Sequence, residues 1–127
     1  MSNPTIETAL ITGASSGIGK ELAYQFAQKG HPVILTARDR GDLEEVCADL
    51  SAKYNVAARF IALDLELPDS VDRIAATLRD EGVQVDILVN NAGFGHRGRF
   101  WEVPVGTSLS ICRVNVEAVV RLTHAFL

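Results

Sequence analysis

Residues 12–19, TGASSGIG, combine three glycines with small hydroxyl side chains between an apolar run and a helical pattern. Such a bare backbone at a strand-to-helix turn lets a bulky anion approach without meeting a Cβ atom. Gly13 can turn the chain sharply, Gly17 can admit the anion, and Gly19 can let the helix pack closely on the strand. The N–H groups at the start of that helix would then face a pyrophosphate. The stretch could also be a loop that only turns the chain, but its position after the first apolar run favours a phosphate site.

Polar residues also follow the later apolar runs of the chain. Asp64 and Leu65 come directly after the third run, and the sequence NNAG (90–93) closes the fourth. Asn115 stands in an otherwise apolar pattern between ICRV and VEAVV. Burying an unpaired amide there would cost about 1–3 kcal/mol, so we expect the Asn115 side chain to serve a purpose. The alternatives are that Asp64 is a solvated acid and that Asn115 is a surface residue.

Four short runs rich in Val, Ile and Leu must position these residues. They show little period-2 alternation, which is typical of parallel strands covered by helices on both faces. The predicted strands are residues 8–12, 32–37, 57–63 and 85–91. Apolar residues at helical spacing between them predict helices, of which the first ends near Gly30 and the third has Pro68 in its first turn. This alternation predicts a Rossmann-type α/β fold, a doubly wound parallel sheet with strand order 3-2-1-4.

The composition limits the classes of protein to which the chain can belong. Its 127 residues suffice for one domain, and a hydrophobic content of 47% excludes a disordered polar chain. A net charge of −4 gives no basic surface for nucleic acid. No stretch of about 18 apolar residues predicts a membrane span, and the N-terminus lacks a signal-peptide pattern. Cys47 and Cys112 lie in apolar helical patterns without metal-ligand spacing, which predicts reduced core thiols in a cytoplasmic protein.

The glycine spacing G-x-x-x-G-x-G, preceded by Thr12, resembles the glycine motif of the short-chain dehydrogenase/reductase family. NNAG at 90–93, the pair Asp64-Leu65 and Asn115 resemble three further motifs of that family. The resemblance extends from residue 6 to residue 127. It implies a nicotinamide dinucleotide cofactor, with hydride transfer between the nicotinamide and a carbonyl or alcohol substrate.

The resemblance implies contacts with the adenosine and phosphate groups of the cofactor. Ser15, Ser16 and Ile18 would contact the adenosine ribose and the phosphates. Asp64 would accept a hydrogen bond from the adenine amino group, and the backbone N–H of Leu65 would bind the adenine ring. These residues form the first part of the implied cofactor site.

The resemblance also implies roles nearer the nicotinamide. The strand end Asn90, Asn91, Ala92 and Gly93 would flank the cofactor ribose and steady the sheet. Asn115 would be the catalytic Asn, which interrupts the regular hydrogen bonding of its helix and holds a proton-relay water. No metal ion is implied.

The proton donor of that family has no match in the sequence. The family uses a Ser and a Tyr with a Lys four positions later, whereas Tyr24 and Tyr54 have no such Lys. Apolar residues also surround the last helical pattern, Leu109 to Phe126, which predicts burial on every side. We therefore expect residues 1–127 to be one NAD(P)-binding domain that ends before the catalytic Tyr and Lys, with the C-terminal side of its sheet incomplete. Alone it should lack reductase activity, and it should self-associate through the open fourth strand and the last helix, or aggregate. We expect the protein to be a homo-oligomer.

The end of the second predicted strand indicates which cofactor is used. Ala37 stands where an acidic residue would accept hydrogen bonds from a ribose 2′-OH, and Arg38 follows it. A guanidinium can hold a 2′-phosphate, so we expect NADP(H) to be preferred over NAD(H), unless Arg38 is only a solvated charge. The predicted function is an NADP(H)-dependent oxidoreductase acting on a small carbonyl or alcohol. The alternative is a non-catalytic, redox-sensing module on the same fold.

Overall fold

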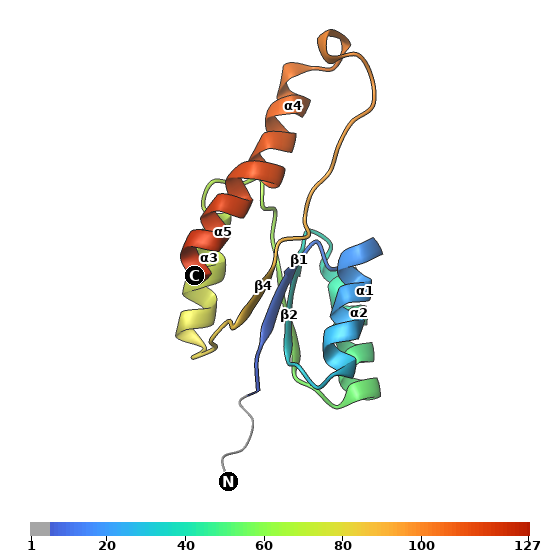
Figure 1. Ribbon diagram of the computed structural model, residues 1–127, viewed down its shortest axis with the longest axis vertical. Helices are drawn as coiled ribbons and strands as arrows, with labels where there is room; N and C mark the ends of the chain where they lie inside the picture. Colours follow the sequence, from blue (N-terminus) through green and yellow to red (C-terminus); the bar gives the residue numbers. More distant parts are fainter. Residues whose placement is uncertain (1–5) are drawn as a thin grey trace.

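A computed structural model describes residues 6–127 of the chain and shows four parallel strands joined by helices (Figure 1). The strands are β1 (Ala9–Thr12), β2 (Val33–Ala37), β3 (Ala58–Ala62) and β4 (Ile87–Val89). The helices between them are α1 (Gly17–Gln28), α2 (Arg40–Tyr54) and α3 (Ser70–Asp80). The strand order is β3-β2-β1-β4, which confirms the predicted doubly wound sheet.

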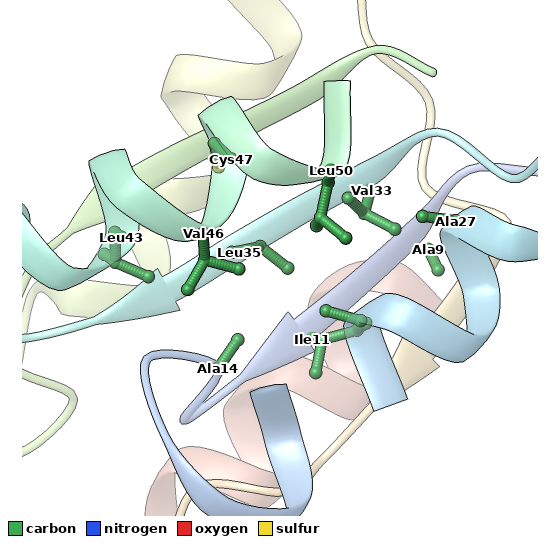
Figure 2. Close-up of a cluster of buried hydrophobic side chains, with 11 residues drawn as sticks. Ala9, Ile11, Ala14, Ala27, Val33, Leu35, Leu43, Val46, Cys47 and Leu50 are labelled. Carbon is green, nitrogen blue, oxygen red and sulfur yellow. The ribbon is translucent and has the colours of Figure 1, made fainter. Parts of the chain in front are cut away.

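The helices form two layers that cover both faces of the sheet. In Figure 1, α1 and α2 lie on one face, while α3 lies on the other. Ile11 of β1 packs with Leu35 and Leu50 in the core shared with α1 and α2, as Figure 2 shows. Its neighbour Leu10 packs in the opposite core with Ile74 of α3. Burial on both faces explains why the strands show so little polar alternation.

The strand register brings the carboxyl ends of all four strands to one edge of the sheet. Thr12 lies opposite Thr36 on β2, and Ile11 lies opposite Val89 on β4. On the other side of β2, Ala37 lies opposite Ala62. The segments that follow the strands therefore emerge side by side, at the place where open parallel sheets bind ligands.

The last part of the chain is one long helical segment. A short 3₁₀ turn, η1 (Phe100–Glu102), precedes α4 (Val105–Cys112), a π-helical turn η2 (Arg113–Glu117) and α5 (Ala118–Phe126). In Figure 1, α5 packs beside α3, and α4 extends beyond the carboxyl ends of the strands. No helix within residues 6–127 is both long enough and apolar enough to cross a membrane.

Burial along this segment is restricted to one narrow stripe. Val114, Ala118 and Leu122 are buried, whereas Val116 is 59% and Val120 62% exposed. The expected burial on every side is therefore not present in residues 6–127, because only the stripe facing the sheet and α3 has elements to pack against. α4 buries none of its residues.

The structure tests what the sequence predicted for the two cysteines, for Pro68 and for Gly30. Cys47 is buried as expected, but Cys112 is exposed because it lies on the uncovered side of α4. Pro68 lies before α3 rather than in its first turn. The N–H groups of Leu67 and Ser70 bond back to Asp64 O and Leu67 O, so these residues form turns and the helix starts later. Gly30 does end α1, with a φ of +90° just after the C-cap.

Candidate cofactor-binding site

A cleft of about 850 Å³ lies at the carboxyl edge of the sheet. It is lined by ten of the residues singled out in the sequence: Gly13, Ser15, Ser16, Ile18, Arg38, Asp64, Leu65, Asn91, Ala92 and Gly93. Four others do not line it: Gly17, Gly19, Asn90 and Asn115. The cleft also contains residues that the sequence did not indicate, among them Thr36, Glu66 and Val114. Segments far apart in the chain thus form one concave site.

The three glycines of the first turn are surrounded differently. Gly13 has a φ of +64°, and a Cβ atom there would lie 2.9 Å from Ala92 Cα. Gly17 has a φ of +58°, and a Cβ atom there would meet no atom within 4 Å. A Cβ atom on Gly19 would lie 2.2 Å from the carbonyl oxygen of Gly13. Gly13 and Gly19 therefore permit close packing, while Gly17 keeps a space open.

The N-terminus of α1 has no capping side chain. Its N-cap residue Ser16 makes no side-chain hydrogen bond to the first turn, and the first turn contains no acidic residue. By contrast, α2 is capped by Asp39, whose Oδ1 accepts from the N–H of Asp42 at 3.0 Å. The first N–H groups of a helix lack partners within the helix, and its N-terminal end is positive. The start of α1 is therefore suited to an anion such as a pyrophosphate.

Asn91 and Thr12 tie the end of β4 to the end of β1. The Thr12 hydroxyl accepts from the N–H groups of Asn91 and Ala92 at 3.0 and 2.8 Å. The Asn91 Nδ2 donates to the carbonyl oxygens of Thr12 and Gly13 at 3.1 and 3.2 Å. These bonds fix the glycine turn against the neighbouring strand end. The sequence indicated Asn91 as a support for the sheet, but it did not reveal the role of Thr12.

Arg38 and Thr36 give the β2 side of the cleft its polar character. Arg38 follows β2 directly, is exposed, and forms no ion pair within residues 6–127. Thr36 is fully buried, and within the same residues its Oγ1 has no hydrogen-bond partner. A buried hydroxyl without a partner is costly, so both groups fit a site that receives a polar ligand.

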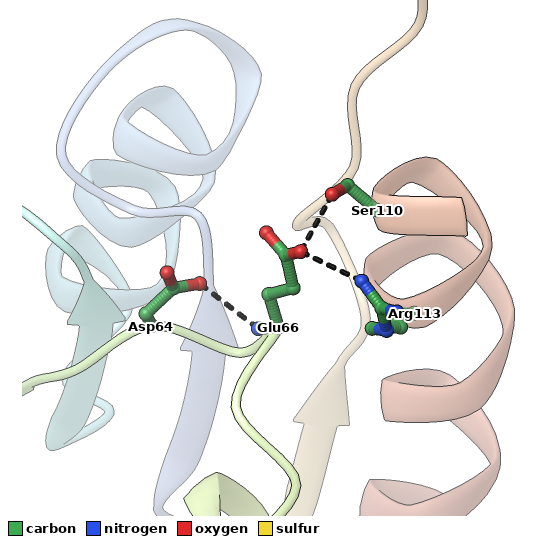
Figure 3. A network of polar contacts seen from close by, with 4 residues as sticks. All are labelled: Asp64, Glu66, Ser110 and Arg113. Carbon is green, nitrogen blue, oxygen red and sulfur yellow. Dashed lines mark hydrogen bonds and ion pairs between the residues drawn. The ribbon is translucent and has the colours of Figure 1, made fainter. Parts of the chain in front are cut away.

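The β3 side of the cleft is held by a polar network (Figure 3). Asp64 Oδ1 accepts from the backbone N–H of Glu66 at 2.9 Å. Glu66 Oε1 accepts from Ser110 Oγ at 2.5 Å and from an Arg113 guanidinium nitrogen at 3.0 Å. The Ser110 hydroxyl, followed by Arg113, holds the pKa of the Glu66 carboxyl below its usual range. No local sequence pattern indicated Glu66, because its partners come from a distant helix.

Asn115 lies in the π-helical turn η2 and is bonded to the loop after β4. Its Oδ1 accepts from the N–H of Phe94 at 3.0 Å, and its Nδ2 donates to Phe94 O at 2.9 Å. Asn115 is exposed, which agrees with the alternative of a surface residue, and both polar atoms of its amide are hydrogen-bonded. A Cβ atom on Gly93 would lie 3.1 Å from its Oδ1. Asn115 thus borders the cleft behind Gly93 and Phe94, without lining it.

Asn90 points away from the cleft. Its Nδ2 donates to the hydroxyl of Thr123 on α5 at 3.3 Å. This bond links the end of β4 to the last helix. Of the four residues NNAG, only Asn91, Ala92 and Gly93 face the cleft.

Comparison with known proteins gives consistent matches over nearly the whole chain. Residues 7–127 match the short chain dehydrogenase family. The very-long-chain 3-oxoacyl-CoA reductase of Pyrenophora tritici-repentis is 39% identical over 120 residues, which cover 91% of this chain and 35% of that protein. The chain therefore spans about a third of the length of this relative.

Two solved structures have the same fold at similar identity. A short-chain dehydrogenase from Sphingobium yanoikuyae in complex with NADPH is 36% identical with a TM-score of 0.88, covering 95% of this chain and 47% of that one. L-sorbose reductase from Gluconobacter frateurii, complexed with NADPH and L-sorbose, is 34% identical with a TM-score of 0.91. It covers 96% of this chain and 46% of that one.

Proposed function

This chain belongs to the short-chain dehydrogenase family, and we propose that its protein is an NADP(H)-dependent oxidoreductase acting on a small carbonyl or alcohol. The observation that carries this proposal is the uncapped N-terminus of α1 in one cleft with Arg38, which forms no ion pair within the described part of the chain. The first suits a pyrophosphate and the second suits a 2′-phosphate. The NADPH complexes of the two similar structures are in line with this choice of cofactor.

We assign the residues of the cleft to successive groups of this cofactor. We assign the pyrophosphate to the start of α1, where Gly17 leaves space and the backbone of Ser15, Ser16 and Ile18 lies close by. Arg38 would hold the 2′-phosphate. Thr36 Oγ1 would gain a partner from the ligand or from a water that it retains.

The remaining residues of the cleft are assigned to its two ends. Asp64 and Leu65 would bind the adenine ring. The backbone of Asn91, Ala92 and Gly93 would border the ribose at the nicotinamide end, while Asn90 would support it from behind through α5. Gly19, which does not line the cleft, would shape the turn rather than touch the ligand, and Gly13 would shape the turn at the point where it lines the cleft.

When bound, the nicotinamide would give a hydride to a carbonyl or take one from an alcohol, and the chain would position the nicotinamide. Asn115 would act in the nicotinamide half by holding the backbone of Phe94, next to the cleft. Tyr24 donates its hydroxyl to Asp49 between α1 and α2, and neither it nor Tyr54 lines the cleft. The proton of the reaction would therefore come from a Tyr–Lys pair elsewhere in the protein, with residues 1–127 forming the NAD(P)-binding part.

We propose a carbonyl compound or an alcohol as the class of substrate, as the family implies. The free thiols Cys47 and Cys112 agree with a reducing compartment, and we propose the cytoplasm. A homo-oligomer is proposed because α4 and α5 expose apolar side chains on the side away from the sheet.

A dinucleotide-binding module without turnover is the second candidate, since no tyrosine lines the cleft within residues 6–127.

The test is oxidation of NADPH by the complete protein with a panel of ketones and aldehydes, and reduction of NADP⁺ with the matching alcohols. Substrate-dependent turnover supports the oxidoreductase. Tight NADPH binding without turnover on any compound favours the binding module. Failure to bind either NADPH or NADH refutes both.

A further inference from the structure

Glu66, Ser110 and Arg113 form a clamp between two segments that are distant in the sequence. Glu66 lies in the turn after β3, and its partners lie 44 and 47 residues later on α4 and η2. One carboxylate oxygen accepts from both partners, at 2.5 Å from Ser110 Oγ and 3.0 Å from the Arg113 guanidinium (Figure 3). The side chains of Glu66 and Arg113 are 32% and 44% exposed, so the pair is only partly screened by water.

The turn held by this clamp carries the residues assigned to adenine. Asp64 Oδ1 accepts from Glu66 N at 2.9 Å, and the Ser70 hydroxyl donates to Leu65 O at 3.4 Å. Asp64, Leu65 and Glu66 all line the cleft. Moving Glu66 would therefore move the Asp64 carboxylate and the Leu65 backbone with it.

Apolar packing does little to fix the other side of the clamp. α4 buries none of its residues, and Cys112 at its end is exposed. The polar contact with Glu66 is thus a main tie between α4 and the turn. The pKa of Glu66 is held below its usual range by Ser110 first and then by Arg113, so the carboxylate is ionised at neutral pH and can accept from both.

We propose that Glu66 is a positioning residue that holds the Asp64–Leu65 turn in the shape that binds the adenosine end of the cofactor. This inference rests on the proposed function, since it assumes that the cleft binds a nicotinamide dinucleotide. Glu66 acts through Asp64 and Leu65, and it makes no contact of its own with the reacting atoms. Substitution of Glu66 should therefore weaken the binding of the adenosine part of the cofactor and leave the binding of the nicotinamide part unchanged.

A purely electrostatic effect of Glu66 has a different signature. Arg38 is also among the positive groups that lower the pKa of Glu66. Removing the negative charge of Glu66 would make the potential around Arg38 more positive and change the affinity for NADPH alone, because NADH has no 2′-phosphate. If Glu66 instead positions the adenine site, its substitution changes the affinities for NADPH and NADH by the same factor.

The experiment measures dissociation constants of NADPH and NADH for the complete protein and for Glu66→Gln, Arg113→Met and their double variant. Ser110→Ala removes one donor without touching the turn, so it serves if Glu66→Gln folds poorly. Glu81→Gln is the matched control, because Glu81 pairs with Arg59 at similar exposure and neither residue lines the cleft. Adenosine 5′-diphosphate and nicotinamide mononucleotide probe the two ends separately.

Glu66→Gln and Arg113→Met should each weaken both cofactors about three- to tenfold, and the double variant should weaken them no further than the stronger single change. Ser110→Ala should weaken both about two- to fivefold, and Glu81→Gln should have no effect. The affinity for adenosine 5′-diphosphate should fall by the same factor as the affinities for the two cofactors, whereas the affinity for nicotinamide mononucleotide should not change.

The positioning role of Glu66 is overturned if folded Glu66→Gln binds both cofactors with wild-type affinity. It is also overturned if only NADPH binding is weakened, or if the binding of adenosine 5′-diphosphate and of nicotinamide mononucleotide is weakened equally. In those cases the wild-type protein still binds NADPH, and the proposed function stands. A wild-type protein that binds neither cofactor overturns the proposed function, and the clamp with it.

Discussion

Gly17 and Gly19 are two residues apart, yet a side chain would meet different surroundings at each. A Cβ atom on Gly17 points into open space, while one on Gly19 would overlap the carbonyl of Gly13 at 2.2 Å and the Asn91 amide at 2.4 Å. The same substitution at the two positions therefore separates packing from ligand binding. The pair tests whether the turn is a phosphate site or only a tight connection.

Gly19→Val should lower the free energy of unfolding by about 3 kcal/mol or more, because backbone atoms must move to admit the side chain. Gly17→Val should cost only about 1–2 kcal/mol, from its positive φ, but should weaken NADPH binding tenfold or more by filling the space for the pyrophosphate. Urea denaturation and NADPH titration of both variants measure these effects. Wild-type NADPH affinity in Gly17→Val would refute the assignment of the pyrophosphate to this turn.

At the scale of the elements, the core shared by α1 and α2 includes two titratable side chains, Cys47 and Tyr24. Burial raises the pKa of the Cys47 thiol on α2 to about 11 from an ordinary value of 9.0. The hydrogen bond to Asp49 raises the pKa of the Tyr24 hydroxyl on α1 to about 12 from 10.0. Both groups are favoured in their neutral form by the fold, so their contributions are present at low pH and are lost as pH rises through the folded values.

The free energy of unfolding should therefore fall from about pH 9 upward, because the Cys47 thiol ionises there in the unfolded chain but stays neutral in the fold. It should fall more steeply from about pH 10, where the same holds for Tyr24. Cys47→Ala should flatten the curve from pH 9, whereas Tyr24→Phe should flatten it only from pH 10. Urea denaturation of the folded protein at half-unit steps between pH 8 and pH 11 gives both curves. Identical slopes for wild type and Cys47→Ala between pH 9 and pH 10 would contradict the burial of the thiol.

The alternation of strands and helices, and the strand order, could be predicted because each element has its own local pattern. The position of the candidate site at the strand ends could also be predicted from local patterns, because Arg38, Asp64 and Asn91 stand at the ends of apolar runs. The contact of Glu66 with Ser110 and Arg113 could not be predicted, because it joins the turn after β3 to helical residues that lie 44 and 47 positions later. The exposure of Asn115 could not be decided from the sequence, because an apolar pattern shows which side chains could be buried but not which elements cover them.

For the whole molecule, the incomplete covering of α4, α5 and β4 is the dominant feature. Leu109, Val116 and Val120 are 48%, 59% and 62% exposed, and β4 is an edge strand within residues 6–127. A surface of this kind favours association. The chain also spans about a third of the matched reductase and just under half of the solved dehydrogenases.

Residues 1–127 expressed alone should self-associate and should show no carbonyl-dependent oxidation of NADPH. Without a positioned proton donor, the rate should be lower by roughly 10²–10⁴ than that of the complete protein. Light scattering gives the mass in solution, and absorbance at the NADPH band gives the rate. A monomeric segment with full turnover would show that the catalytic acid lies within these residues.

The most direct test of the NADP(H) site is the affinity of Arg38→Ala for NADPH and NADH, with Arg40→Ala as the control. Arg40 pairs with Glu44 and lies over the ring of Phe60, outside the cleft lining. A hydrogen bond to a charged group contributes about 1.5–3 kcal/mol, so Arg38→Ala should weaken NADPH binding by tenfold to a hundredfold and leave NADH binding unchanged. Arg40→Ala should bind both cofactors like the wild type. Equal NADPH affinity of Arg38→Ala and the wild type would contradict the NADP(H) site.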